Sequence, residues 1–262
     1  SLNKWMPNIT KDISVSLIEG LPNILNMFDK AIINYSEEFI LKSSIDLRLN
    51  TFVKGVDENT VSIEHNKRVT QLPYGILIWA TGNQPRDISV NLAKKLGDHQ
   101  SERRGLQITD KLQVLGAEES IFAIGDCTYH TGLAPTAQVA HQEGAYLGEL
   151  FSHLYEIDQL SWKIAQPGLS RKRATKLKDK MKDMVIHLPN FVYDYKGSLA
   201  YIGAERAVVD LKIAGKDYQL RGSPFAFFFW KIVYLSMCVS FRNSLVVSMD
   251  WFKTYFFGRG NV

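Results

Sequence analysis

The chain has 262 residues, of which 45% are hydrophobic and 22% are charged, a composition typical of globular domains. This composition excludes disordered, collagen-like and coiled-coil architectures and leaves room for one large domain or two modest ones. The two cysteines form no C-x-x-C motif, so we expect neither a metal site nor a disulfide-stapled fold. The net charge of +4 is too small to indicate a nucleic-acid partner, and we expect none.

Charge and aromatic residues are concentrated near the C-terminus. Between residues 220 and 262, five basic residues accompany one acidic residue, and the same segment holds 12 of the 30 aromatic residues. Such a segment is typical of an element that lies on a membrane surface. The chain begins with Ser1 and shows neither a targeting pattern nor a signal core there, so we expect the C-terminal part of a longer protein or an incomplete gene product.

The first third of the chain alternates between strand and helix patterns. An alternating strand over residues 13–18 ends at Glu19-Gly20 and leads into a helix. A run over residues 74–79 is almost entirely apolar, as in a strand buried on both faces of a parallel sheet. This order predicts the second half of a doubly wound nucleotide-binding domain. The elements expected between these two strands are a helix over 26–41 and strands over 45–49, 52–55 and 60–63.

A second strand–turn–helix unit follows. A strand over residues 120–124 ends at Gly125-Asp126, and a helix over 136–150 has Thr136 as its N-cap. The basic segment 161–183 is expected to be a solvated face or a connection. Strand patterns return over 191–220, with turns at Lys196-Gly197 and Gly215-Lys216.

Glu19 stands at the end of the first predicted strand. An acidic residue at this place in a β-α-β unit accepts hydrogen bonds from the adenosine ribose and repels a 2′-phosphate, which favours NADH over NADPH. A solvated acid is the alternative, because no G-x-G-x-x-G motif precedes Glu19 in the sequence.

Two later strand ends carry glycine, at Ala80-Thr81-Gly82 and at Gly125-Asp126. Glycine lets the backbone pass close to a ligand, and an aspartate suits hydrogen bonding to a polyol. Ordinary turn glycines are the alternative for each site alone. As a pair they predict two linked nucleotide-binding domains.

The helix after Thr136 opens with AQVAHQ. Its first-turn N–H groups and positive dipole end can face an electron-rich ligand edge, such as a flavin pyrimidine ring. Gln138 and Gln142 share one helical face, and His141 adjoins it. A satisfied surface or core histidine is the alternative for His141.

Two apolar segments follow residue 223. The first is nearly long enough to span a membrane, but Lys231 interrupts it and Arg242 ends it. We predict two amphipathic helices in the membrane interface, with a buried helical hairpin as the alternative. The expected apolar stripes are Phe227, Trp230, Tyr234, Met237 and Phe241 on the first helix, and Leu245, Met249, Phe252 and Phe256 on the second.

Seven segments carry a resemblance to the type II NADH dehydrogenases, which are single-chain, rotenone-insensitive NADH:ubiquinone oxidoreductases. The segments are LIEGLPNILNMFDK, LPYGILIWATGN, RGLQITDKLQV, IFAIGDC, LAPTAQVAHQEGAYLG, GSLAYIGAERA and FFFWKIVYLSM. The resemblance covers essentially the whole chain and points most closely to the fungal mitochondrial internal enzyme.

The resemblance implies an α/β flavoprotein with two dinucleotide-binding domains and a C-terminal domain of β-strands and amphipathic, membrane-anchoring helices. Residues 1–82 would complete the NADH-binding domain, 83–160 the FAD-binding domain, and 161–262 the membrane and quinone domain. The glycine-rich loops for FAD and NADH would precede Ser1.

The resemblance also implies roles for single residues. Glu19 would hold the NADH ribose, and residues 80–82 would border the nicotinamide and the flavin. The turn at Gly125-Asp126 would bind the ribityl or pyrophosphate part of FAD. Ala137 would contact the isoalloxazine, which Lys196-Gly197 would approach from the C-terminal domain.

The residues expected to act in the reaction are Gln138, His141 and Gln142. Gln138 and His141 would contact the flavin, all three would lie near the quinone ring, and Tyr234 would line the quinone tunnel. Hydride would pass from NADH to FAD, and two electrons would then pass to ubiquinone without proton pumping.

The implied protein is a peripheral protein of the mitochondrial inner membrane, on the matrix side, attached through residues 223–257 and forming a homodimer. Two alternatives stay open. A soluble ferredoxin or disulfide reductase would need a C-x-x-C motif or would lack the amphipathic segment. A truncated, inactive, membrane-associated remnant would lack tightly bound FAD.

Overall fold

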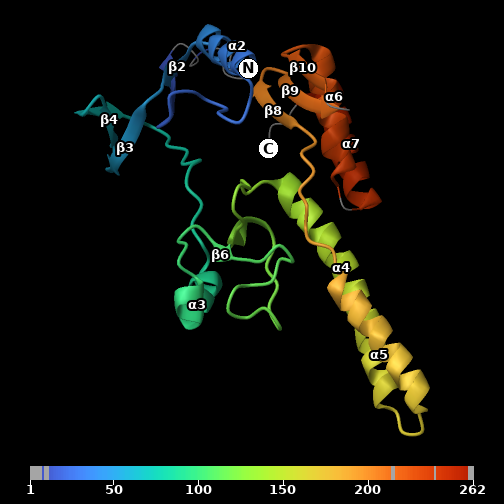
Figure 1. Cartoon of the computed structure of the whole chain (residues 1–262). Coiled ribbons are helices and arrows are strands. Elements are labelled where there is room, and N and C mark those ends of the chain that lie inside the picture. The colour runs from blue at the N-terminus through green and yellow to red at the C-terminus, as the bar shows by residue number, and fades with distance from the viewer. Residues whose placement is uncertain (1–7, 9–11, 214–215, 239, 259–262) are drawn as a thin grey trace. The chain divides into compact units, whose positions relative to one another are not determined.

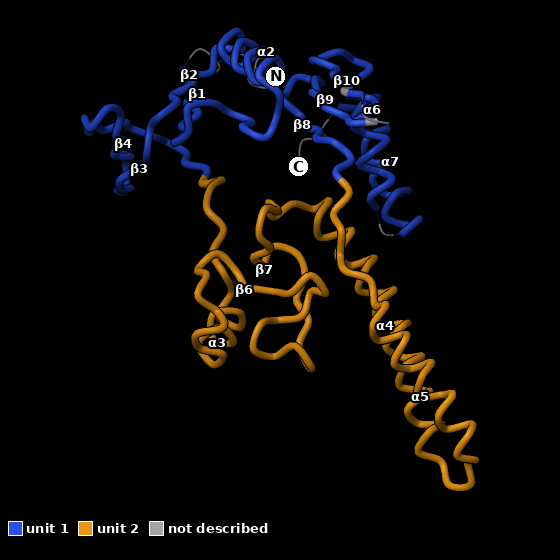
Figure 2. The backbone as a smooth tube through the Cα atoms, viewed as in Figure 1, with its two compact units in different colours: residues 1–78, 195–262 blue, residues 79–194 orange. Residues whose placement is uncertain are grey.

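A computed structural model describes residues 8, 12–213, 216–238 and 240–258. The chain divides into two compact units, shown in Figure 2: unit 1 contains residues 1–78 and 195–262, and unit 2 contains residues 79–194. These units reflect contacts within this chain. The division into domains at residues 82 and 160 stays a prediction.

Unit 1 begins with a parallel β-α-β element, as the sequence predicts. The side chain of Asp29 accepts a hydrogen bond of 2.8 Å from the Ala31 N–H, so the helix begins later than the predicted residue 26. Ile32 and Ile33 bury the inner face of this helix. The bounds are β1 Val15–Ile18, α2 Lys30–Lys42 and β2 Ile45–Arg48, with Val15 paired to Ile45 and Ile18 to Arg48.

A three-stranded antiparallel sheet follows (Figure 1). Its central strand alternates, with Val61 and Ile63 buried on one face. A bulge between Val53 and Gly55 marks the edge strand. The third strand lies beyond those that the sequence predicts. The bounds are β3 Thr51–Val56, β4 Thr60–His65 and β5 Arg68–Pro73.

The predicted buried strand over residues 74–79 is wrong for this structure. The segment forms no strand, and Ile76 and Ile78 are 86% and 82% exposed. A strand buried on both faces needs neighbouring strands for its N–H and C=O groups and helices above and below it. No strand of the described residues pairs with it. The apolar pattern is therefore present without the partners that would make it a strand.

Unit 2 combines short elements with a long helical hairpin. The predicted strand over 120–124 is reduced to an isolated bridge between Phe122 and Gln113, after which Gly125 begins a 3-10 turn. The predicted helix is confirmed and extends beyond residue 150. The bounds are α3 Asp87–Leu96, η2 Gly97–His99, β6 Leu106–Gln107, η3 Gly125–Cys127, β7 Thr128–Tyr129, α4 Ala137–Ala165 and α5 Arg171–Ile186.

The C-terminal part of unit 1 is an antiparallel sheet covered by helix α6. Ala207, Val208 and Val209 in the central strand are fully buried, and Ala226 of α6 is buried as well. A tight turn with positive φ at Ala204 and Glu205 joins the first two strands. The predicted turn at Gly215-Lys216 includes Gly215, which lies outside the described residues. The bounds are β8 Ser198–Gly203, β9 Arg206–Ile213, β10 Lys216–Arg221, α6 Pro224–Ser236 and α7 Phe241–Phe257.

Candidate functional site

Glu19 directly follows the parallel strand β1. Its N–H donates to the Arg48 carbonyl at 2.9 Å, and its Oε1 accepts from the Leu21 N–H at 2.9 Å. The neighbouring Gly20 passes the Phe52 ring so closely that a Cβ would lie 2.8 Å from it. The carboxylate is thus fixed at the carboxyl end of a parallel strand, the place where nucleotides bind in this class of sheet.

Residues 80–82, expected beside the nicotinamide and the flavin, form an exposed segment outside any helix or strand. Gly82 has a φ of 79°, which favours glycine, and no atom lies within 4 Å of the place where its Cβ would be. The segment is open to a ligand, and its predicted contacts stay a prediction.

The turn at Gly125-Asp126 is held against the start of helix α4. The Gly125 N–H donates to Glu143 Oε2 at 2.7 Å, and the Thr128 hydroxyl donates to the Gly125 carbonyl at 2.8 Å. Gly125 has a φ of 74°, and a Cβ there would lie 3.5 Å from the Ala140 methyl group. The Asp126 side chain is exposed beside this fixed turn.

Glu143 is a residue of the candidate site that the sequence does not predict. It is 1% exposed, and its Oε1 has no hydrogen-bond partner among the described residues. Burial raises the pKa of Glu143; the Gly125 N–H and His130 oppose this rise, and Asp126 adds to it. Its position in the sequence could have indicated its burial, because Glu143 shares the inner helical face with the buried Val139 and Leu150.

His130 lies in the same region. Its Nε2 is 3.9 Å from Asp110 Oδ1, and its Nδ1 is buried without a hydrogen-bond partner among the described residues. A cavity of about 10 Å³ adjoins it, room for roughly one water molecule. The cavity is lined by Gly125, Thr128, His130, Leu133, Ala134, Pro135, Thr136 and Val139.

Helix α4 presents its first turns as predicted. Thr136 is the N-cap, and its side chain accepts from the Val139 N–H at 3.3 Å. Ala137 and His141 are exposed, so both are accessible to a ligand at the helix N-terminus.

The segment at Tyr193-Asp194 lies against the glutamine face of α4. The Tyr193 hydroxyl donates to Gln138 Oε1. Gln142 donates to the Asp194 carbonyl and accepts from the Asp194 N–H, both at 2.9 Å. The side-chain amide of Gln142 therefore ties this segment to α4. Tyr193 was not predicted, because nothing in its local pattern indicates a partner 55 residues away.

The remaining predicted site residues belong to unit 1. Gly197, beside Lys196, has a φ of 112°, and a Cβ there would lie 2.3 Å from the Asp210 carbonyl oxygen. Tyr234 is 49% exposed and stacks on Trp230, with ring centroids 5.4 Å apart. The approach of Lys196 to a flavin and of Tyr234 to a quinone stay predictions.

The C-terminal segment forms two helices as predicted, but Phe241, expected on the first helix, begins α7. The interfacial orientation expected for the first stripe stays a prediction, and part of the stripe is covered by protein. Phe227 and Trp230 pack on Tyr201 of strand β8, and Trp230 also contacts Trp251 of α7. The Lys231 ammonium lies over the rings of Phe227 and Trp251, at 4.6 and 5.2 Å. Much of this stripe therefore faces protein, because the sheet offers it an apolar surface.

Other apolar side chains of these helices are exposed. On α6 they are Phe225, Phe228 and Ile232, and on α7 they include the whole predicted stripe of Leu245, Met249, Phe252 and Phe256. Among the residues that the structure describes, no helix is long and apolar enough to cross a bilayer.

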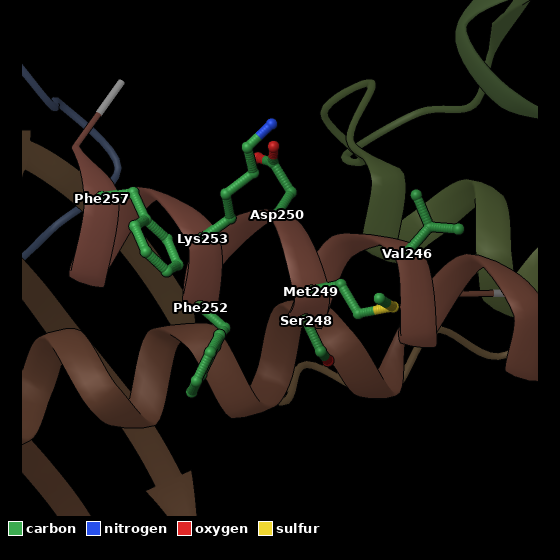
Figure 3. A pocket seen from close by; sticks show the side chains of 7 residues that line it. All are labelled: Val246, Ser248, Met249, Asp250, Phe252, Lys253 and Phe257. Atoms are coloured by element: carbon green, nitrogen blue, oxygen red, sulfur yellow. The ribbon is translucent and has the colours of Figure 1, made fainter. Parts of the chain in front are cut away.

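A shallow surface hollow of about 680 Å³ lies along α7 (Figure 3). Asp250 and Lys253 extend to one side of the helix, and Phe252 to the other. All of its lining residues come from this one helix, so the hollow is an open apolar surface: Val246, Ser248, Met249, Asp250, Phe252, Lys253 and Phe257.

Flavin chemistry fits the donor and acceptor groups of unit 2. The exposed Asp126 carboxylate can accept hydrogen bonds from ribityl hydroxyls, and the exposed start of α4 offers N–H groups to an electron-rich ring. Gly125 allows the turn beside them, because glycine adopts a positive φ without a steric clash. In the part of the chain that the structure describes, no group of three metal-ligating side chains could hold a metal ion.

Two family models match the chain. Residues 7–144 match the pyridine nucleotide-disulphide oxidoreductase model, and residues 195–260 match the NDH2 C-terminal domain model. The first match covers more than half of the chain and includes Glu19, residues 80–82 and the start of α4. The second includes the sheet β8–β10 and both C-terminal helices.

Relatives from several organisms match almost the whole chain. External NADH-ubiquinone oxidoreductase 2, mitochondrial, from Saccharomyces cerevisiae is 47% identical over 98% of this chain and 47% of its own length. The Internal alternative NAD(P)H-ubiquinone oxidoreductase A1, mitochondrial, from Arabidopsis thaliana is 32% identical over 96% of this chain and 46% of its own length. The chain spans about half the length of the curated relatives it matches.

A solved structure shares the fold. The structure of NDH2 from Plasmodium falciparum in complex with NADH superposes with a TM-score of 0.79 at 23% identity, and the match covers 99% of this chain and 62% of that chain. The match confirms the α/β fold predicted from the sequence. The chain therefore belongs to the pyridine nucleotide-disulphide oxidoreductase family and, within it, to the type II NADH dehydrogenases.

Proposed function

We propose that the protein to which this chain belongs oxidises NADH and transfers two electrons to ubiquinone, with FAD as the carrier and without proton pumping. The observation that carries the proposal is the fixed turn at Gly125-Asp126, which presents an exposed carboxylate beside the exposed start of α4. The names of the relatives support the same pair of substrates.

In this proposal the residues of the chain bind and position the reactants. Asp126 binds the ribityl or pyrophosphate part of FAD, and Ala137, Gln138 and His141 contact its ring edge. Glu19 binds the ribose of NADH. When bound, FAD supplies the two-electron chemistry that links NADH to the quinone.

The quinone end of the site rests on Gln138, His141, Gln142 and Tyr234. The structure adds a positioning role, since Tyr193 fixes the carbonyl of Gln138 and the Asp194 backbone fixes the amide of Gln142. Side chains held by such contacts lose little freedom when a quinone binds.

We also propose peripheral attachment to the mitochondrial inner membrane through residues 223–257. Exposed apolar side chains on α6 and α7 support this, as do the mitochondrial names of the relatives. The matrix side stays our prediction, and the yeast relative is named external while the plant relative is named internal. Protease protection in isolated mitochondria and mitoplasts determines the side, and light scattering tests the predicted homodimer.

A second candidate is an inactive membrane-associated remnant, which the absence of a G-x-G-x-x-G motif from the sequence favours. A soluble disulfide reductase would need the C-x-x-C motif that the chain lacks. The FAD content and the NADH:ubiquinone activity of the purified protein separate the two remaining functions.

The deciding experiment combines this assay with Glu19→Gln in the flavin-loaded enzyme. Removing the charge that repels a 2′-phosphate lowers the preference for NADH over NADPH about ten- to thirtyfold in kcat/KM. The matched control is Glu58→Gln, at an exposed turn between β3 and β4. An unchanged NADH/NADPH ratio means that Glu19 is a solvated acid, and a flavin-loaded protein inactive with NADH and ubiquinone overturns the proposed function.

A further inference from the structure

The tip of the α4–α5 hairpin is strongly basic. Between Gln159 and Lys178 the sequence contains no aspartate or glutamate. Six basic residues lie in this stretch: Lys163, Arg171, Lys172, Arg173, Lys176 and Lys178. In Figure 1 the hairpin runs away from the other elements of unit 2, and the tip is its far end.

Helix α5 turns its basic residues outward. Ala174, Leu177, Met181 and Met184 are half-buried at helical spacing, and the Ser161 hydroxyl of α4 donates to the Met181 sulfur at 3.1 Å. This stripe packs on α4, while all six basic residues are exposed. No residue of α5 is fully buried. The cations therefore lie on a solvent-facing surface and are not part of a core.

These cations form no ion pairs that would hold the hairpin together. Among the residues that the structure describes, no carboxylate lies within 4.0 Å of any of the six basic groups. Arg171, Lys172 and Arg173 occupy the first turn of α5, which contains no acidic residue. Positive charge at a helix N-terminus is unfavourable, because the dipole is positive there. The three cations at the start of α5 thus oppose helix stability, which indicates a partner outside the chain, whereas the dipole favours Lys163 in the last turn of α4.

An exposed aromatic side chain accompanies the cations. Trp162, in the last turn of α4, is 61% exposed, and Leu169 is half-buried in the connection to α5. Tryptophan beside lysine and arginine is typical of the membrane–water interface, where the ring reaches the acyl boundary and the cations meet lipid phosphates.

We propose that the hairpin tip, defined as residues 162–176, binds the anionic surface of a lipid bilayer as a contact separate from helices α6 and α7. The charge of the tip is complementary to anionic headgroups, and Trp162 and Leu169 favour a bilayer over nucleic acid or an acidic protein. The inference does not depend on the proposed redox reaction.

The test measures sedimentation of the full chain with phosphatidylcholine vesicles, with and without phosphatidylglycerol. The tip variant is R171Q/K172Q/R173Q/K176Q. The control variant, K67Q/R68Q/K94Q/K95Q, removes the same charge from exposed residues that form no ion pair among the described residues. We expect the tip variant to lose at least tenfold in affinity for the anionic vesicles and the control to lose less than threefold.

Trp162→Phe gives a second readout. Brominated lipids should quench the indole emission of the parent chain more than that of this variant, because Trp162 reaches the bilayer. Equal losses in the tip and control variants overturn the proposal, as does binding that is independent of anionic lipid. Unchanged quenching in Trp162→Phe also overturns it, as does an RNA oligonucleotide that displaces the vesicles from the tip.

Discussion

At the scale of single residues, Glu143 joins two parts of the candidate site. Its carboxylate holds the Gly125 N–H from inside unit 2, and the other face of the same turn exposes Asp126. A buried acid with an unpartnered oxygen is unfavourable when it is ionised. The position therefore trades stability for a fixed turn, as functional sites often do.

The pH dependence of the stability of Glu143→Gln tests whether the buried carboxyl destabilises the fold when it is ionised. Burial raises the pKa of Glu143 above its ordinary value of 4.5, so the folded chain favours the protonated carboxyl. That stabilisation is complete below the ordinary pKa and is lost as the pH rises through the raised pKa. We expect the variant to gain stability relative to the parent as the pH rises. Urea unfolding at several pH values measures this, with the exposed Glu149→Gln as control; a constant difference contradicts it.

Gly197 and Gly203 form a matched pair of positive-φ glycines, with φ values of 112° and 98°. A Cβ at Gly197 would lie 2.3 Å from the Asp210 carbonyl oxygen. At Gly203, no atom lies within 4 Å of the place where a Cβ would be. We expect Gly203→Ala to cost about 1–3 kcal/mol through strain alone and Gly197→Ala to exceed about 4 kcal/mol. Thermal unfolding of both variants checks the order, and equal losses would show that the backbone at Gly197 relaxes.

Single residues also show how far the sequence predicts the site. Thr136 and Glu19 are recognisable because caps and strand ends are set by neighbours in the chain. Tyr193 and Glu143 are not, because their roles depend on contacts made by folding, with Gln138 and with Gly125. The buried stripe of α4 includes Glu143, and a carboxylate in such a stripe is the signal that could have found it.

At the scale of elements, α7 has one face that packs on other side chains and one face that is exposed. Trp251 contacts Trp230 and Tyr234 and lies under Lys231, whereas the adjacent Phe252 is 61% exposed. One helix therefore packs on α6 with one face and presents apolar side chains with another. The hairpin interpretation of the sequence describes the packed face, whereas the membrane-interface interpretation of the exposed face stays a prediction.

Trp251→Ala and Phe252→Ala should therefore affect different properties of the chain. We expect Trp251→Ala to lower the free energy of unfolding by about 2 kcal/mol through lost ring contacts, and Phe252→Ala to change it by less than about 0.5 kcal/mol. Phe252→Ala should instead weaken vesicle binding about tenfold, because it removes apolar area that enters the bilayer. Amide exchange of β9 and vesicle sedimentation measure the two effects. A large stability loss in Phe252→Ala would show that α7 is a core helix.

Elements also mark where sequence patterns fail. Strands β1, β2, β3 and β4 follow from local alternation and turns, and they form as expected. Residues 74–79 carry an equally clear pattern but form no strand and are mostly exposed. The difference is pairing, because a central parallel strand depends wholly on neighbours that its own sequence does not contain.

At the scale of the whole molecule, the chain combines groups that suit a flavin with a sequence that contains no G-x-G-x-x-G motif. Asp126 and the start of α4 are exposed and can bind the ribityl chain and the ring edge. The pyrophosphate of a dinucleotide is bound chiefly by a glycine-rich loop at a helix N-terminus in such folds. We therefore expect these 262 residues alone to bind the pyrophosphate weakly.

We expect the purified 262-residue chain to retain much less than one FAD per chain, because ring and ribityl contacts alone must offset the entropy lost on binding. Flavin absorbance after gel filtration measures the content, and circular dichroism confirms that the chain is folded. Asp126→Ala should then lower the weak affinity for added riboflavin, while Asp98→Ala, at an exposed position in η2 of the same unit, should leave it unchanged. Stoichiometric FAD in the parent would show that residues other than a glycine-rich loop bind the pyrophosphate. If the folded parent chain does not bind riboflavin, the turn at Gly125-Asp126 does not bind the flavin.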